Sequence, residues 1–145
     1  MIAKFTGNIT FESGNNKITY NFNKVKAQFD QTVGPRAEVI FNTTGEEQPE
    51  KLARVFFDIA RDYNGQNKGR DVNVLAREIV ISFPPDEKIG TEDLVSYTNQ
   101  YLHKMGYSDC PHIIYRHNDT LNTHVHILTS TITYDLTHVE NNNDF

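Results

Sequence analysis

Residues 113–134 read IIYRHNDTLNTHVHILTSTITY, which joins two β-type runs that both carry histidine. The first apolar run ends at His117, and the second, rich in β-branched residues, begins at His124. Because residues two apart on a strand project from the same face, His124 and His126 point to one side of a sheet. A short hairpin between the runs returns His117 beside them. The stretch therefore predicts two adjacent strands that present three imidazoles on one face.

Three neutral imidazoles that meet at one point form a site for a divalent metal, with open positions for water or substrate oxygens. The alternative is a solvated strand face that happens to carry histidines. Three of the six histidines fall within ten residues, and two have strand-face spacing. We therefore predict a metal site with His117, His124 and His126 as its ligands.

The rest of the chain predicts an α+β domain. Spacings of three and four between apolar residues indicate helices, and alternation indicates strands. Thr91 is the expected cap of the third helix. We expect an antiparallel sheet with helices packed on one face, leaving an open histidine-bearing face. The expected elements are strand 2–6, helix 18–30, strand 37–41, helix 49–63, strand 75–83, helix 91–106, and strands at about 111–117 and 123–134.

Length and composition fit one domain over residues 1–145, with ordinary hydrophobic (37%) and charged (23%) content. No apolar run approaches the ~20 residues that span a bilayer, so we expect no membrane contact. The start lacks the features of a signal peptide. The single cysteine, Cys110, suits a reducing compartment, so we expect a cytoplasmic protein. Few residues follow the second histidine strand, and we expect the chain to be the front part of a longer protein.

The charge pattern gives no global signature of a nucleic-acid-binding protein, because the net charge is −5. The charges are unevenly distributed: residues 1–36 carry a net charge of +3, and residues 37–145 carry −8. A further basic cluster, formed by Arg61, Lys68 and Arg70, surrounds a glycine-bearing loop. On charge alone, plain solvation of these side chains is the simpler interpretation.

A metal that polarises a phosphoryl oxygen still needs a nucleophile. No G-x-S-x-G motif, phosphate loop or H-E-x-x-H motif occurs, and Cys110 has no activating neighbours. This leaves tyrosine, water or no catalysis. Among the seven tyrosines, Tyr20 stands out because it lies in a polar segment among Lys17, Lys24 and Lys26. By position alone, however, Tyr20 is more simply a partly exposed helix residue.

Residues 113–127 resemble the third motif of MOB-type relaxases, the mobilization nucleases of conjugative and mobilizable elements. That motif has the form H-x-D-T-x-x-x-H-x-H-I, and it contains the HUH signature (U is hydrophobic) shared with rolling-circle initiators. The likeness continues upstream through residues 75–84 and 102–107. It covers about residues 1–135 and is strongest from 75 to 132.

The resemblance implies a relaxase that nicks one DNA strand at an origin of transfer and stays attached to the 5′ phosphate through a tyrosine. In the family this tyrosine lies at the start of the first helix. Tyr20 is the only tyrosine in the first 60 residues, so the role falls on it. The family often has an aliphatic residue after the tyrosine, whereas this chain has Asn21, which is a departure.

The resemblance also assigns the metal and its surroundings. His117, His124 and His126 match the metal ligands, with Mg²⁺ or Mn²⁺ as the implied cation, although imidazole suits Zn²⁺ as well. Asp119 matches the acid of the motif and would orient a histidine, the alternative being a turn-forming residue. Glu78 lies where some relatives keep an acid, and would act as a base or orient a histidine; a plain salt bridge is the alternative.

The implied partner is single-stranded or hairpin DNA at the origin, with accessory mobilization proteins and a coupling protein. The expected DNA contacts are basic, namely Lys17, Lys24, Lys26, Arg61, Lys68 and Arg70. Within DNA chemistry, the alternative is a rolling-circle replication initiator or a single-strand transposase. From another class, a non-catalytic DNA-binding remnant with a structural metal also fits, and the acidic balance and short chain favour it slightly.

Overall fold

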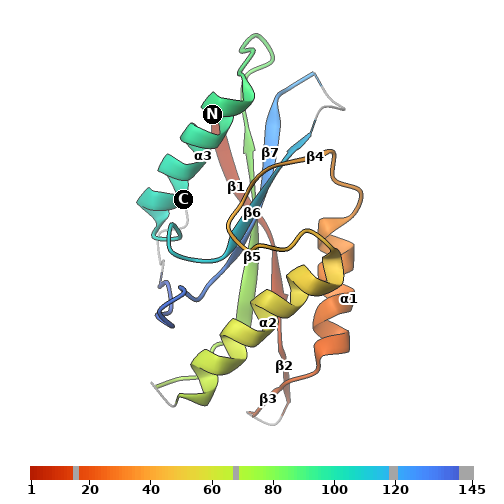
Figure 1. The fold of residues 1–145 in the computed structure, drawn as a ribbon, viewed down its shortest axis with the longest axis vertical. Helices are drawn as coiled ribbons and strands as arrows, with labels where there is room; N and C mark the ends of the chain where they lie inside the picture. Colours follow the sequence, from red (N-terminus) through yellow and green to blue (C-terminus); the bar gives the residue numbers. More distant parts are fainter. Residues whose placement is uncertain (15–16, 67–68, 118–120, 141–145) are drawn as a thin grey trace.

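A five-stranded antiparallel sheet in the order β1-β5-β7-β6-β4 forms the centre of the computed structural model, and a separate hairpin, β2–β3, lies at one end (Figure 1). The structure describes residues 1–14, 17–66, 69–117 and 121–140. The elements in chain order are β1 (Ile2–Thr10), β2 (Glu12–Gly14), β3 (Lys17–Thr19), α1 (Phe22–Val33), β4 (Glu38–Asn42), α2 (Pro49–Gly65), β5 (Val74–Ser82), α3 (Thr91–Met105), β6 (His112–His117) and β7 (His124–Ser130).

The α+β class and the antiparallel sheet predicted from the sequence are confirmed. Three bounds differ from the prediction by four residues: α1 begins at Phe22 rather than at residue 18, β1 ends at Thr10 rather than at residue 6, and β7 ends at Ser130 rather than at residue 134. Strand β3 uses the residues before α1 to pair with β2. The Asn21 side chain then caps the helix by accepting hydrogen bonds from the backbone N–H groups of Asn23 (3.0 Å) and Lys24 (3.4 Å).

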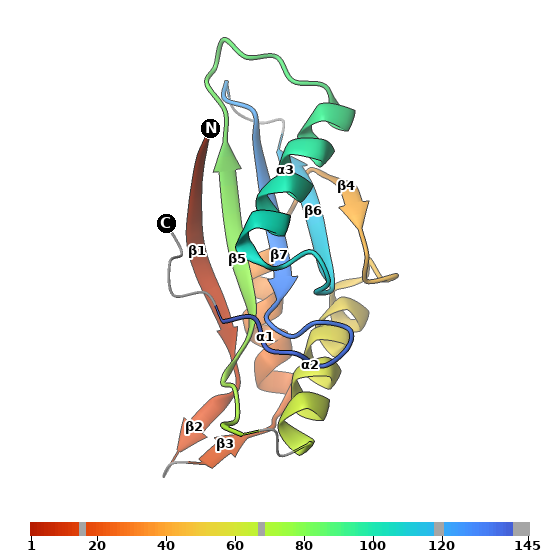
Figure 2. The same cartoon turned by 90° about the vertical axis from the view of Figure 1, so that its left-hand side faces the viewer.

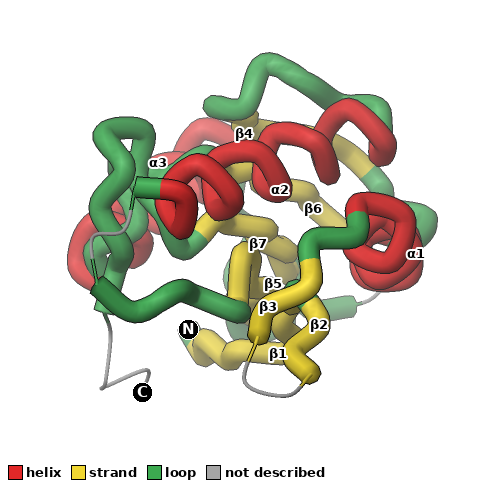
Figure 3. The backbone as a smooth tube through the Cα atoms, turned by 90° about the horizontal axis from the view of Figure 1, so that it is seen from below, coloured by secondary structure: helices red, strands yellow, loops and turns green. Residues whose placement is uncertain are grey.

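The expectation that all helices cover one face of the sheet is wrong, because the central strands carry apolar side chains on both faces. Helices α1 and α2 pack with Ala76, Ile113 and Leu128 in one buried cluster. Helix α3 packs in a second cluster with Ile79 and Ile127, whose side chains point to the other face. Figure 2 shows α3 in front of the sheet and α1 behind it, and Figure 3 shows the two helices on opposite sides from below.

Helix α3 also differs from the prediction at its start. Thr91 is its first residue, not its cap, and Gly90 occupies the cap position without a side-chain hydrogen bond. The Thr91 hydroxyl instead accepts a hydrogen bond from Arg116 on β6 (2.9 Å), which ties the helix to the sheet.

Among the described residues, no helix combines the length and apolar character needed to cross a bilayer.

The alternation along β7 decides where the histidines lie. Val125 and Ile127 are buried on the α3 side. His124 and His126 therefore share the opposite face with Leu128, which packs beneath α1 and α2. The histidine-bearing face is thus the face that carries two helices, and the histidines lie next to the C-terminal end of α1.

The C-terminal cap of α3 requires a glycine, and this requirement can be tested by mutation. Gly106 has φ of +88°, and its N–H donates to the carbonyl groups of the last helical turn. A Cβ at this position would lie 3.4 Å from Val139 Cγ1. We expect Gly106→Ala to lower the free energy of unfolding by about 1–2 kcal/mol, because L-residues other than glycine are strained in this conformation. Chemical denaturation measures the change.

Gly65→Ala is the matched control, since Gly65 is the last residue of α2, has no positive φ and has open space around its Cα. Alanine is favoured over glycine in a helix, so this variant should lose no stability. Equal losses in the two variants would show that the left-handed conformation of Gly106 is not what requires glycine.

Candidate metal centre

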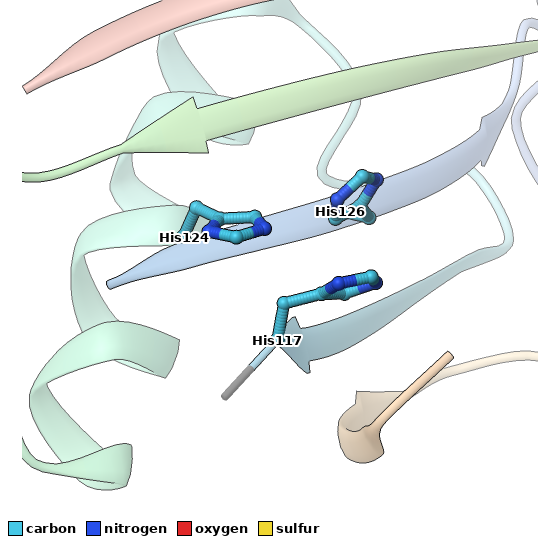
Figure 4. Close-up of side chains that lie close together, drawn as sticks. All are labelled: His117, His124 and His126. Atoms are coloured by element: carbon cyan, nitrogen blue, oxygen red, sulfur yellow. The ribbon is translucent and has the colours of Figure 1, made fainter. Parts of the chain in front are cut away.

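The register of β6 and β7 brings the three histidines together. His117 pairs with His124 across the two strands, and Tyr115 pairs with His126. Each histidine offers one ring nitrogen, and these three atoms all lie within 4.8 Å of one another. The closest rings are those of His117 and His126, whose centroids are 4.2 Å apart. Figure 4 shows the rings gathered on one face of the two strands.

The orientation of His124 is set by the backbone before β7. Its Nδ1 lies 3.1 Å from the carbonyl oxygen of Asn122. A carbonyl oxygen only accepts, so Nδ1 carries the proton and Nε2 offers the lone pair. This arrangement, an imidazole oriented by a hydrogen bond from its second nitrogen, is usual for histidines that bind metals.

The three histidines fit a divalent metal. Imidazole nitrogens bind such ions at about 2.0–2.1 Å, so ligands on one ion lie at most about 4 Å apart. The separations here reach that range after small ring rotations. An all-imidazole set suits Zn²⁺ and other transition metals, whereas Mg²⁺ or Mn²⁺ would need oxygen ligands from water or phosphate at the open positions, so the three histidines do not select one cation.

Arg36 and Glu78 form a charged pair beside the histidines. Arg36 Nη1 lies 2.7 Å from His126 Nδ1 and 3.4 Å from His117 Nε2. Arg36 Nη2 donates to Glu78 Oε2 and to the backbone carbonyl of Thr32 in the last turn of α1. Glu78 Oε2 is also 3.8 Å from His126 Nδ1.

Glu78 is held in its ionised form. Burial alone would raise the pKa of its carboxyl group, but the neighbouring His126 and Thr6 side chains, together with the Arg36 charge, hold that pKa below its ordinary value. The Thr6 hydroxyl donates to Glu78 Oε1 at 2.7 Å. A carboxylate with a lowered pKa is a poor proton acceptor, so this environment suits an orienting role better than a basic one. The salt bridge weighed as the alternative is present.

The structure does not bring Tyr20 to the histidines. Tyr20 precedes the N-cap of α1, whereas Thr32 and Arg36, which contact the site, lie at the other end of that helix. The 12 residues of α1 span about 18 Å. The Tyr20 side chain is 41% exposed and packs edge-to-face on Phe11, with ring centroids 5.0 Å apart.

Tyr115 is a tyrosine that does lie at the histidine site. It pairs with His126 in the sheet and lines the same small cavity as Arg36 and Glu78. Only 6% of the residue is exposed, and burial raises the pKa of its phenol. Cys110 lies elsewhere: it is buried under α3, and burial raises its pKa to about 12, which agrees with the expectation that it is not a nucleophile.

Only part of the predicted basic set gathers in one place. Lys17 and Arg70 line one groove between the β2–β3 hairpin and the loop before β5, together with Asp71. The other basic residues predicted to contact DNA that the structure describes form surface salt bridges: Lys24 with Glu12 (2.6 Å), Lys26 with Asp30 (2.8 Å) and Arg61 with Asp58 (3.5 Å). Lys68 and Asp119 lie outside the described residues.

Sequence reasoning did not assign two residues that contact Glu78, namely Arg36 and Thr6. The signal for Arg36 is present in the sequence. Gly34, with φ of +52°, and Pro35 end α1, so Arg36 is the first polar side chain beyond the helix. No comparable signal marks Thr6, because its contact with Glu78 depends on the pairing of β1 with β5.

The family model described as "Relaxase: MobA/VirD2-like, nuclease domain" matches residues 14–145. A search of curated proteins finds no match.

The histidine cluster gives a direct metal-binding prediction. In the double variant His124→Ala, His126→Ala, two of three ligands are lost, so Mn²⁺ uptake by isothermal titration calorimetry should fall below detection. Both side chains are only partly buried, so the circular dichroism spectrum should remain that of the folded protein. His103→Ala, on the exposed side of α3, is the matched control and should bind as the unmodified chain does. Undiminished binding by the double variant would place the metal elsewhere.

Proposed function

Because the chain belongs to the relaxase family of MobA/VirD2-like nuclease domains, we propose that it is the DNA-nicking domain of a relaxase. The single observation that supports this beyond the family is the centre formed by His117, His124 and His126. The substrate would be one DNA strand at an origin of transfer, in single-stranded or hairpin form. Accessory mobilization proteins and a coupling protein are further partners that this function implies.

The three histidines would hold a divalent cation, Mg²⁺ or Mn²⁺, which stabilises the charge that develops on a phosphoryl group. Glu78 would position His126 through Arg36, because its Oε2 accepts from Nη2 while Nη1 of the same guanidinium lies against His126 Nδ1. Arg36 adds a permanent positive charge next to the same face. For Asp119, orientation of a histidine stays a proposal from the motif alone.

Tyr20 is the proposed nucleophile, and this part of the proposal rests on the resemblance. Its oxygen would form a bond to phosphorus, while the 3′ oxygen leaves and takes up the proton. One phosphodiester is exchanged for another, so the step is reversible and allows later strand rejoining. Because Tyr20 lies about one helix length from His126, the segment around the start of α1 would have to approach the histidines in the DNA complex.

The same distance favours a second candidate function, a metal-bearing domain that binds DNA without cutting it. In such a domain, Tyr20 would serve as an exposed aromatic surface for a base. The groove with Lys17 and Arg70 lies at the same end of the molecule as Tyr20, since Lys17 begins the three-residue strand β3 and Tyr20 follows its last residue. DNA binding is therefore common to both candidates, and cleavage separates them.

Tyr20→Phe tests the nucleophile. The change removes one oxygen from a partly exposed side chain, so folding, Mn²⁺ affinity and DNA affinity should remain unchanged. The covalent protein–DNA adduct, seen on a denaturing gel with an oligonucleotide that carries the cognate origin, should disappear.

Tyr115→Phe is the comparison variant, since Tyr115 is the tyrosine beside His126. Loss of the adduct in Tyr115→Phe alone would assign the nucleophile to β6. No cleavage and no adduct by the unmodified chain on that oligonucleotide would support the non-catalytic candidate.

The basic groove should make DNA binding dependent on salt. For single-stranded DNA, the slope of log K against log salt concentration is about −0.7 per phosphate contact. The double variant Lys17→Gln, Arg70→Gln should therefore reduce the slope by about 1.4, measured by fluorescence anisotropy with a labelled oligonucleotide. Lys88→Gln, Lys104→Gln removes the same charge near α3 and should leave the slope unchanged. Equal changes in the two double variants would argue for a general charge effect instead of a groove.

A further inference from the structure

The Arg36 guanidinium lies against ring nitrogens of two of the three proposed metal ligands. Its Nη1 is 2.7 Å from His126 Nδ1 and 3.4 Å from His117 Nε2. A guanidinium has only N–H donors and remains charged at any ordinary pH. The imidazole nitrogens that face it therefore accept through their lone pairs, which are the electrons that would bind a metal.

The other half of the guanidinium is anchored away from the histidines. Nη2 donates to the carbonyl of Thr32 and to Glu78 Oε2. A helix C-terminus and a carboxylate both favour a cation, so the position of Nη2 is stabilised independently of the imidazoles. The Arg36 side chain is 13% exposed. Its Nη1 can thus leave the histidines by a small rotation while Nη2 keeps its partners.

We infer that Arg36 is an internal cation that competes with the divalent metal for His117 and His126. The inference rests on the proposed metal site. Metal binding displaces Nη1 from the two imidazoles, and repulsion between the two cations opposes the exchange. The displaced N–H groups would remain beside the histidines, where they would donate to a phosphate oxygen of a bound DNA strand. Arg36 thereby lowers the affinity of the chain for the metal in the absence of DNA. It raises that affinity when a DNA phosphate is bound, because the phosphate then accepts from Arg36.

A purely structural role for Arg36 predicts the opposite effect on metal affinity. If the side chain only fastened α1 to the sheet through Thr32 and Glu78, its loss would loosen the histidine face and weaken metal binding. Competition predicts that its loss strengthens metal binding. The direction of the change in affinity therefore separates the two roles.

The experiment is a calorimetric titration of the whole chain with Mn²⁺ in the absence of DNA. In Arg36→Gln the amide can still donate to Glu78 or Thr32, but the positive charge is gone. We expect Arg36→Gln to bind Mn²⁺ about tenfold more tightly than the unmodified chain. Arg36→Lys keeps the charge and should stay close to the unmodified chain. Arg116→Gln is the control for loss of a positive charge. Arg116 precedes His117 on β6, but its side chain lies on the opposite face and contacts Thr91, so this change should alter the Mn²⁺ affinity little.

Equal or weaker binding by Arg36→Gln would overturn the inference while leaving the metal site in place. Absence of Mn²⁺ binding in every variant and in the unmodified chain would overturn the metal site, and the inference with it. If Arg36→Gln does not fold, the unmodified chain provides the second measurement. On titration with diamagnetic Zn²⁺, the ¹⁵N signal of the Arg36 guanidinium should shift along the same curve as the His126 ring signals. A guanidinium signal that stays constant through that titration would exclude displacement.

Discussion

The pairing register of β6 and β7 is the constraint on which the rest of the site depends. It places His117 opposite His124 and Tyr115 opposite His126. A slip of one residue would turn the histidines of one strand to the other face. Val125 and Ile127 prevent this slip, because both are fully buried against α3 and would have to exchange places with charged or polar groups. The apolar residues between and beside the histidines thus fix the metal-binding geometry.

The residues around the histidine site could be only partly predicted from the sequence. The three histidines were recognisable because strand periodicity is local, and two residues define it. The pair of Arg36 and Glu78 joins positions 42 residues apart in the chain, and Arg36 lies 90 residues from His126. Gly34 and Pro35 mark where α1 ends, but they do not show which strands lie beside that end. The contact arises because α1 ends beside the face formed by β5 and β7, which is a property of the packed sheet.

For the same reason, the sequence alone does not predict which helix covers which face of the sheet or where Tyr20 lies. The β-branched and apolar residues of the central strands predicted a sheet, but strands buried on both faces do not show which helix covers which face. Helical spacing from residue 18 onward did not reveal the β2–β3 hairpin, whose three-residue strands are too short for a clear period. That hairpin leaves Tyr20 just before the Asn21 cap, and so at the end of α1 away from the histidines.

Helix α1 therefore separates two features that a relaxase would use together. One end carries Tyr20 and, beyond β3, the groove with Lys17 and Arg70, and the other end carries the Arg36 contact with the histidines. One DNA strand that binds along α1 would span the separation of about 18 Å between these two ends. The remaining described basic residues of the predicted set form exposed salt bridges with acids, so Lys17, Arg70 and Arg36 are the proposed phosphate contacts along such a path. A net charge of −5 is compatible with such a path, because a bound strand responds to the local field along the groove more than to the sum over the chain.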